Sequence, residues 1–344
     1  MSGKILVTGA AGYLGAQLVP VLAKSGRPVL ALDRLECRFE LPGVDAVRCD
    51  MRDEEALAQV FAEHSVDQVV HLATELNIAV NSQEELFRNN VAMTRSLLRA
   101  TERRPLRGLV FTSSFAVYSG LPGSAPIGED VRPVSIDEYG KSKIACEELL
   151  EAARRNFPVA ILRCPLVIGD GRVGMLSILF DLIAQGSPLF TLKRGAIRHH
   201  CVSSEDTLAA IRLCLDRPNN LTVNLGTAEV RTFRELFQDL IAHAGSRTRM
   251  VDIGSWWSIP LLRLLFRCGL SPLGPHQFRM LTEDCVLDVS RAEKKLGWKA
   301  GTGHLQMMRE AYDDYLRPAA GASAVSPNSR PVKARLLRLL RFIR

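Results

Sequence analysis

The stretch LVTGAAGYLG (residues 6–15) places Gly9, Gly12 and Gly15 directly after an apolar run that is typical of a buried strand, and a helical pattern follows it. Gly9 permits a tight turn, Gly12 lets the backbone come close to a pyrophosphate, and Gly15 allows close packing of helix on strand. The N-terminus of the following helix would direct its N–H groups and positive dipole end at the phosphates. The spacing therefore predicts a dinucleotide-binding strand–turn–helix unit, and a purely structural turn is the alternative.

Apolar runs and amphipathic patterns alternate through the first two-thirds of the chain. The apolar runs predict strands at 4–9, 28–33, 46–50, 67–73, 108–114 and 159–165. The amphipathic patterns predict helices near 13–25, 53–63, 84–103 and 139–156. Such alternation indicates parallel strands joined by right-handed crossovers, so we expect an α/β fold with a Rossmann-type doubly wound parallel sheet.

Beyond residue 170 the pattern is looser and predicts a smaller mixed α/β lobe. Further helices are predicted near 174–186, 204–217, 232–244 and 304–316, with a short strand at 222–226. We therefore expect three parts: a dinucleotide-binding Rossmann domain at 1–165 with helical contributions from later segments, a substrate-binding lobe at 166–316, and a linker with a basic amphipathic tail at 317–344.

Composition restricts the class of protein and its partners. With 47% hydrophobic and 24% charged residues, the chain has the balance of a soluble globular protein, and no run of 18 uncharged apolar residues predicts a membrane-spanning helix. Its eight cysteines form no CxxC pair, so we predict neither a structural metal site nor a disulfide framework, and a cytoplasmic location. The net charge of +7 resides in the seven basic residues from Arg317 onward, because the other 37 basic residues match the 37 acidic ones. We therefore expect no nucleic-acid partner for the folded part.

Asp33 points to the identity of the dinucleotide. It ends the second predicted strand, where a carboxylate accepts hydrogen bonds from the adenine-ribose hydroxyls and repels a 2′-phosphate. This favours NAD over NADP, although the neighbouring Arg34 could accommodate a 2′-phosphate. Asp50 and Met51 follow the third predicted strand and are expected near the adenine.

The segment EYGKSK places Tyr139 and Lys143 four residues apart on a predicted helix, so both side chains lie on one helix face. A tyrosine with an ordinary pKa of about 10 is a poor base at neutral pH. The ammonium group of Lys143 and a positively charged nicotinamide ring would favour the phenolate and lower that pKa. Ser114 ends the fifth predicted strand, at the edge where open parallel sheets bind ligands, and its hydroxyl could hydrogen-bond the reacting oxygen. A surface helix and a strand-terminating serine are the alternatives.

Taken together, these motifs resemble the extended short-chain dehydrogenase/reductases, in particular the NAD-dependent epimerase/dehydratase family. The resemblance runs from Lys4 to about Leu316, and the 25-residue step from Ser114 to Tyr139 equals that of the sugar 4-epimerase branch. It rests on TGAAGYLG (8–15), CDMRD (49–53), HLAT (71–74), RNNVAMT (88–94), SSFAVYS (113–119), YGKSK (139–143), LRCPLVIGDG (162–171), VNLGTAEVRTFREL (223–236) and DVSRAEKKLGW (288–298).

The resemblance implies a set of site residues and a homodimer, which is common among relatives. It implies a catalytic triad of Ser114, Tyr139 and Lys143. The positions that match cofactor contacts are Gly9, Gly12, Tyr13, Leu14, Gly15, Asp33, Asp50, Met51, Leu72, Ala73, Thr74, Asn90, Tyr139 and Lys143.

Departures from the family pattern bear on the reaction. The 4,6-dehydratases carry an Asp-Glu pair directly after the active-site hydroxyl, where this chain has Phe115 and Ala116, which cannot transfer protons. Dehydration is therefore disfavoured, and so is sugar-nucleotide decarboxylation, which also uses a Glu in this loop. Many members that bind nucleotide sugars have an Asn after the sixth strand, where this chain offers Pro165 and Leu166. That departure is nearer to steroid-type and other alcohol dehydrogenases.

Candidate substrate residues lie in the second half of the chain. A substrate diphosphate would require arginines from the lobe, and Arg198 and Arg279 are the candidates, with ordinary surface arginines as the alternative. His199 and His200 have no partner at metal-binding spacing, so we expect them in packing or at the surface.

Two segments resemble surfaces that bind lipid. Residues 330–344 form an amphipathic helical pattern with Leu and Ile on one stripe and Lys and Arg around the rest, which suits an anionic membrane. A partner-binding helix and a disordered basic end are the alternatives. The segment 256–269 is also rich in Trp and Leu, and a helix of the substrate lobe is its alternative. Peripheral membrane contact would suit a lipid-linked sugar as substrate.

The predicted function is an NAD-dependent epimerase that acts on a hydroxyl of a nucleotide sugar or lipid-linked sugar by transient oxidation to a keto intermediate. Tyr139 would remove the hydroxyl proton, Ser114 would hold the oxygen, and Lys143 would tune Tyr139. The main alternative is an NAD(P)-dependent alcohol or hydroxysteroid-type dehydrogenase or ketoreductase with net cofactor turnover. A non-catalytic NAD-binding protein is a third reading, which the complete Ser–Tyr–Lys set disfavours.

Overall fold

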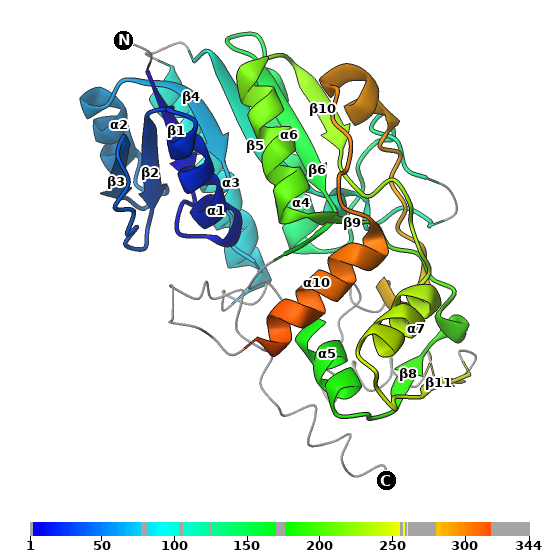
Figure 1. Ribbon diagram of the computed structural model, residues 1–344. Helices are drawn as coiled ribbons and strands as arrows, with labels where there is room; N and C mark the ends of the chain where they lie inside the picture. The colour runs from blue at the N-terminus through cyan, green and yellow to red at the C-terminus, as the bar shows by residue number, and fades with distance from the viewer. Residues whose placement is uncertain are drawn as a thin grey trace.

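The computed structural model describes residues 3–76, 82–102, 106–123, 126–169, 176–254, 257–258, 260 and 280–317. Its centre is a seven-stranded sheet in the order β10-β6-β5-β4-β1-β2-β3, in which every pairing is parallel (Figure 1). This confirms the predicted Rossmann-type doubly wound sheet. The strands are β1 (Lys4–Thr8), β2 (Val29–Asp33), β3 (Val44–Arg48), β4 (Val66–His71), β5 (Gly108–Ser114), β6 (Val159–Cys164) and β10 (Leu221–Asn224).

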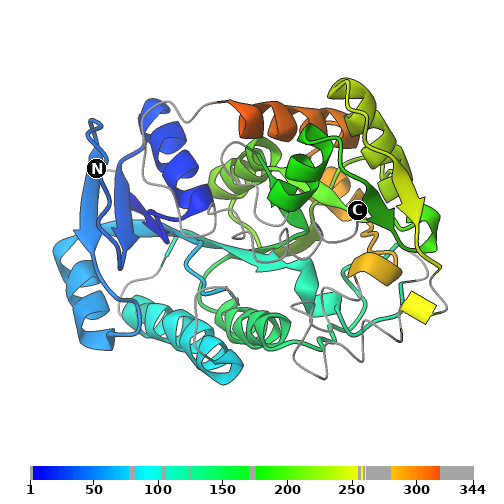
Figure 2. The same ribbon diagram turned by 90° about the horizontal axis from the view of Figure 1, so that it is seen from below.

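Helices cover both faces of the sheet, as Figure 2 shows with the sheet seen from below. Alternate residues of a strand point to opposite faces, so each strand supplies two apolar layers. One layer packs on α2 (Glu54–Glu63), α3 (Gln83–Thr101) and α4 (Glu138–Ala153) through residues such as Leu97 and Leu150. The opposite layer packs on α1 (Tyr13–Lys24) and α6 (Ser204–Asp216). The continuous apolar runs of the sequence reflect this burial on both faces.

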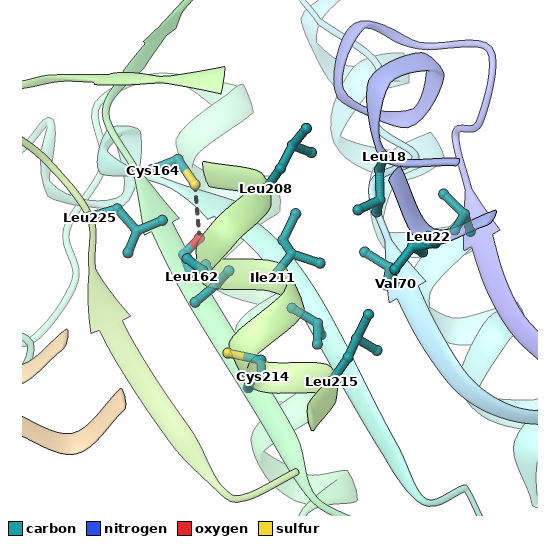
Figure 3. Packing of buried hydrophobic residues seen from close by; sticks show 14 of the residues in the cluster. Leu18, Leu22, Val70, Leu162, Cys164, Leu208, Ile211, Cys214, Leu215 and Leu225 are labelled. Carbon is teal, nitrogen blue, oxygen red and sulfur yellow. Dashed lines mark hydrogen bonds between the residues drawn. The ribbon is translucent and has the colours of Figure 1, made fainter. Parts of the chain in front are cut away.

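The α1/α6 side of the core joins the two halves of the chain. Leu208, Ile211 and Leu215 of α6 pack over the sheet beside Leu18 and Leu22 of α1 (Figure 3). The last strand, β10, pairs with β6 at the sheet edge. A strand as well as a helix from beyond residue 165 therefore belongs to the sheet layers.

The order of the strands reverses between β1 and β4. From β1 the chain proceeds outward to β2 and β3, then returns to β4 on the other side of β1 and continues through β5 and β6. Loops that leave neighbouring strands in opposite directions open a crevice at the carboxyl ends of the strands, and ligands of open α/β sheets bind there.

The smaller lobe has its own apolar core. Ile168, Phe180, Leu240 and Tyr312 are among its buried residues, and α5, α7 and α10 lie together below the sheet in the view of Figure 1. The helices are α5 (Leu176–Ala184), α7 (Phe233–His243) and α10 (His304–Leu316), and the short strands are β7 (Leu166–Ile168), β8 (Leu189–Thr191), β9 (Cys201–Ser203) and β11 (Met250–Asp252).

The helices of the lobe agree with the predicted ones, whereas its four short strands lack a sequence signal. They pair as β7 with β9 and β8 with β11, each over three residues. Residues 330–344 and most of 256–269 lie outside the described residues. Within the part of the chain that the structure describes, no helix combines the length and apolar character required to cross a bilayer.

Candidate functional site

A cavity of about 350 Å³ lies at the carboxyl ends of the central strands, on both sides of the β1/β4 switch point. Its wall includes every residue proposed above as a cofactor contact except Asn90, and it includes Ser114, Tyr139 and Lys143. Residues as far apart in the sequence as Gly9 and Val167 therefore line one cavity.

In the turn between β1 and α1, the positions of Gly9 and Gly15 have no room for a side chain. Gly9 has a φ of +70°, a backbone conformation that side chains disfavour, and a Cβ on it would lie 2.7 Å from the backbone nitrogen of Ala73. A Cβ on Gly15 would lie 2.3 Å from the carbonyl oxygen of Gly9. Gly12 is the N-cap of α1 and offers no side chain to the helix N-terminus, which faces the cavity. This arrangement fits the pyrophosphate of a dinucleotide.

Asp33 connects the end of β2 to the glycine turn. One carboxylate oxygen accepts the N–H of Ala11 at 3.0 Å, and the other accepts the N–H of Leu35 at 2.9 Å. Each oxygen keeps a lone pair for a ribose hydroxyl, as the predicted role requires. Arg34 lines the same cavity, but its guanidinium forms an ion pair with Glu75 at 2.9 Å.

Asp50 and Met51 also line this end of the cavity. The side chain of Asp50 accepts hydrogen bonds from the Arg52 guanidinium and backbone, and the Arg52 side-chain bond is the main reason that its pKa is lowered. Asp50 therefore stays a carboxylate beside the expected adenine position.

Lys143 lies at the other end of the cavity and is almost fully buried. Its ammonium group donates a hydrogen bond to the carbonyl of Thr112 at 3.0 Å and lies 4.6 Å from the ring centre of Phe111. Burial lowers the pKa of Lys143 to about 8, so the side chain remains mostly protonated at neutral pH. Its nitrogen is 5.8 Å from the ring centre of Tyr139, near enough for the positive charge to favour a phenolate there.

Gly140 brings the helix that carries Tyr139 against the loop that carries Ser114. A Cβ on Gly140 would lie 2.3 Å from the carbonyl oxygen of Ala116, in the short 3-10 helix η1 (Phe115–Tyr118) that follows β5. Asp137 caps α4 by accepting the N–H of Gly140 at 2.8 Å. This close approach explains why the glycine inside YGKSK matters, although the sequence singled out only the Tyr and the Lys.

Ser114 accepts the N–H of Ala116 at 3.2 Å and so caps η1. Accepting this bond uses a lone pair and leaves the hydroxyl hydrogen for a substrate oxygen. The side chains beside it on the cavity wall are Phe115, Ala116, Pro165 and Leu166. None of these four groups can donate or accept a proton. Thr112 and Ser113 also line the cavity, but their hydroxyls donate to the His71 carbonyl and to the Glu147 carboxylate.

Asn90 is not among the residues that line the cavity. It is buried, its amide oxygen accepts the N–H of Glu75 at 2.7 Å, and its amide nitrogen donates to the Ser142 hydroxyl at 3.0 Å. Ser142 in turn donates to the carbonyl of Tyr139 at 2.7 Å. Asn90 thus links the loop after β4 to the helix that carries Tyr139, and its predicted contact with the cofactor stays a prediction.

His71 is buried and connects β1, the strand before the glycine turn, to α3 through hydrogen bonds. Its two ring nitrogens lie 2.8 Å from the Thr8 hydroxyl and 3.1 Å from the Thr94 hydroxyl. Burial, and to a lesser degree the charge of Lys143, lowers the pKa of His71 to about 3. The imidazole is therefore neutral at physiological pH, and it links β1 to α3 by hydrogen bonds.

The predicted substrate residues of the lobe are not among those that line this cavity. Arg198 is half exposed and forms an ion pair with Asp284 at 2.6 Å, and Arg279 lies outside the described residues. His199 and His200 are both buried; His200 accepts the N–H of Leu287 at 2.9 Å through Nδ1. Among the described residues, no group of three or more His, Cys, Asp or Glu side chains is arranged to hold a metal ion.

The residues present fit NAD. Gly12 places no side chain at the N-terminus of α1, where a pyrophosphate would bind. Asp33 offers carboxylate oxygens near the ribose position, and Lys143 reaches the opposite end of the same cavity. Glu75, Thr112 and Gly140 shape the site through contacts with Arg34, with Lys143 and with the Ala116 carbonyl, and the motifs did not single them out. Each acts through a tertiary contact rather than through a local pattern.

Comparisons with known proteins agree with this geometry. The model of the NAD dependent epimerase/dehydratase family matches residues 5–226. The uncharacterized protein y4nG of Sinorhizobium fredii is 33% identical over 98% of this chain and 85% of its own length. The UDP-glucose 4-epimerase of Bacillus subtilis is 26% identical over 90% of this chain and 95% of its own length.

The solved structure of the Thermotoga maritima UDP-glucose 4-epimerase with UDP-glucose has the same fold, with a TM-score of 0.75. It is 22% identical and covers 91% of this chain and 98% of its own. The family match spans more than half of the chain, including β1 to β10 and the whole Ser–Tyr–Lys set. The chain therefore belongs to the NAD-dependent epimerase/dehydratase family, and it is an NAD-dependent epimerase or oxidoreductase of the extended short-chain dehydrogenase/reductase type.

Proposed function

We propose that this protein is a sugar epimerase that oxidises a hydroxyl of a nucleotide sugar with bound NAD and then reduces the keto intermediate from its other face. The observation that carries the proposal is the convergence of Ser114, Tyr139 and Lys143 on one cavity whose neighbouring wall is apolar. Its similarity to the Bacillus subtilis UDP-glucose 4-epimerase over nearly the full length of both chains supports the same choice.

Tyr139 acts as the general base in this reaction. Its phenolate takes the proton of the sugar hydroxyl and returns it after the keto intermediate has turned over. Ser114 donates a hydrogen bond to the reacting oxygen, and the buried Lys143 ammonium stabilises the phenolate. NAD supplies the site that accepts the hydride and gives it back.

The apolar residues beside Ser114 restrict the reaction to this proton transfer. A dehydratase needs a further acid–base pair to move a proton at a neighbouring carbon, whereas Phe115 and Ala116 provide none. The chemistry therefore stops at the keto stage, and the simplest outcome is return of the hydride.

Pro165 and Leu166 favour a second candidate, an alcohol or hydroxysteroid-type dehydrogenase or ketoreductase. They line the cavity and have no side-chain group to bond a sugar diphosphate. Such an enzyme would release its product and exchange its cofactor at each turnover. The two candidates therefore differ in the fate of the hydride.

The test uses purified protein with UDP-glucose as probe and one equivalent of NAD, while UDP-galactose is measured by chromatography and NADH by absorbance. We expect many turnovers of UDP-galactose per NAD with no accumulation of NADH. A rise of NADH in step with substrate loss would instead establish the dehydrogenase. Turnover of a polyprenyl-linked sugar, with none of UDP-glucose, would overturn the nucleotide-sugar substrate.

Assembly and location are part of the same proposal. We propose a cytoplasmic homodimer with a Rossmann domain at 1–165 and a substrate lobe at 166–316, which touches membranes through 330–344. Sedimentation velocity tests the dimer. Liposome co-sedimentation of the full chain and of a chain without 318–344 tests the tail, and equal binding by both would contradict its role.

A further inference from the structure

Arg34 and Glu75 form an ion pair between the two loops that flank the glycine turn. Arg34 follows β2 and Glu75 lies in the loop after β4, and these strands are the two neighbours of β1 in the sheet. Both residues line the cofactor cavity, and Arg34 Nη1 lies 2.9 Å from Glu75 Oε1. The ion pair therefore lies at the end of the cavity where Asp33 is expected to bind the adenine ribose.

Glu75 is held rigidly in this position. Its side chain is 8% exposed, and its second carboxylate oxygen accepts a hydrogen bond from Asn89 Nδ2 at 2.7 Å. Its backbone N–H donates to Asn90 Oδ1 at 2.7 Å, and its carbonyl accepts from Asn90 Nδ2 at 3.2 Å. Helix α3 thus fixes both the backbone and the carboxylate of Glu75, so the acceptor for Arg34 is preorganised.

Arg34 is the residue in this cavity that would attract a 2′-phosphate. The other arginine of the lining, Arg52, forms an ion pair with Asp50 at 2.5 Å. To bind a phosphate, Arg34 would have to leave Glu75, and a buried carboxylate without its cation is costly. The phosphate would also lie among the carboxylates of Asp33, Asp50 and Glu75.

We propose that Glu75 is a specificity-determining residue: it sequesters Arg34 in an ion pair beside the ribose position and thereby makes the site reject NADP. Without Glu75, the free guanidinium of Arg34 could bind a 2′-phosphate and offset its repulsion by Asp33. The ion pair with Glu75 makes Arg34 unavailable for that phosphate. This inference concerns cofactor binding and holds whether the enzyme is an epimerase or a dehydrogenase.

The test measures dissociation constants of NAD and NADP, and of 5′-ADP and 2′,5′-ADP, by calorimetry on protein freed of bound nucleotide. In Glu75→Gln, Arg34 is released and one negative charge is removed. A hydrogen bond between charged groups corresponds to a factor of about 10 or more in binding, so we expect the preference for the nucleotides without the 2′-phosphate to fall by about 10-fold or more. An unchanged preference would overturn the proposal.

Two further variants separate sequestration from general electrostatics. Glu36→Gln removes the same charge from the exposed Glu36–Arg38 pair nearby and should leave the preference unchanged within about two-fold. An effect equal to that of Glu75→Gln would contradict the specific role of Glu75.

Arg34→Gln tests the role of the arginine without removing Glu75. Because Arg34 is already sequestered, this variant should change the wild-type preference by less than about three-fold, and it should abolish the gain when combined with Glu75→Gln. A loss of NADP binding of about 10-fold or more in the single variant would show that Arg34 already binds the phosphate, against the proposal.

Discussion

The carboxyl edge of the central sheet and the smaller lobe use polar side chains in opposite ways. At the sheet edge, Asp33, Ser114, Tyr139 and Lys143 are carried by strand ends or a helix start and line one cavity. In the lobe, several described polar side chains bond one another, as Arg198 does with Asp284 and Tyr315 with Asp181. The first arrangement positions groups for a ligand, whereas the second holds the lobe together. Substitutions at the sheet edge should therefore affect cofactor binding and chemistry, and matched substitutions in the lobe should affect mainly stability.

The largest difference in kcat is expected between the phenylalanine variants of two tyrosines, one at the sheet edge and one in the lobe. Tyr139→Phe removes the proposed general base, and kcat should fall by about 10²- to 10⁴-fold while NAD remains bound. Tyr315→Phe removes a hydroxyl that donates to Asp181 at 2.5 Å, and it should leave kcat within about two-fold. Steady-state kinetics and quantification of retained NAD measure both variants. A Tyr139→Phe enzyme with wild-type kcat would refute the assigned base.

The buried lysine should leave a signature in the pH dependence of stability. With a pKa of about 8 against 10.5 when unfolded, Lys143 is deprotonated in the folded state and protonated in the unfolded state between these values. Unfolding then takes up a proton at this residue, so Lys143 contributes a rise of about 3 kcal/mol in the free energy of unfolding across this window, and the comparison with Lys143→Met isolates that contribution. Lys143→Met should lose this rise, as urea unfolding of NAD-free protein from pH 7 to 10.5 can measure. Parallel curves for the two proteins would contradict the burial of a titrating ammonium.

Two glycines offer a smaller contrast. The Cβ of Gly15→Ala would lie 2.3 Å from the Gly9 carbonyl, so the turn must shift; we expect a loss of about 1–3 kcal/mol of stability and weaker NAD binding. Gly303, the N-cap of α10, has nothing within 4 Å of an added Cβ. Gly303→Ala should change stability by less than about 1 kcal/mol and leave NAD binding unaltered. Calorimetric Kd values for NAD and thermal unfolding test both variants. Equal losses of NAD binding in the two variants would argue against a role of the glycine turn at Gly15 in binding NAD.

The smallest effect concerns Arg198, which the sequence suggests as a substrate residue and the structure pairs with Asp284. Because this ion pair is half exposed, Arg198→Gln should cost less than about 1 kcal/mol of stability. A role in binding a substrate diphosphate predicts a higher KM for the nucleotide sugar with kcat unchanged. An unaltered KM would remove Arg198 from the substrate site.

The two regions also differ in how far their sequence predicted them. Strands such as 108–114 are buried on both faces and carry a continuous apolar run, so their existence and parallel order follow from local composition. Strand β8 (Leu189–Thr191) has three residues and exposes Phe190, and only its pairing with β11 makes it a strand. Such pairing is a tertiary property without a local pattern.

The site shows the same division. Gly9, Asp33, Ser114 and Tyr139 follow strands or begin helices in recognisable motifs, and the structure gathers them at one edge. Glu75 belongs to no motif. Its importance arises because the sheet order places the loops after β2 and β4 on either side of β1, where its carboxylate meets Arg34.

The fate of the hydride tests the proposed epimerase most directly. The measurement incubates the protein with UDP-glucose deuterated at C4 and much less than one equivalent of NAD, then locates the deuterium by mass spectrometry and NMR. The epimerase mechanism predicts UDP-galactose that retains deuterium at C4, with no growth of NADH absorbance. Deuterium that appears in NADH in proportion to a released keto product would contradict it.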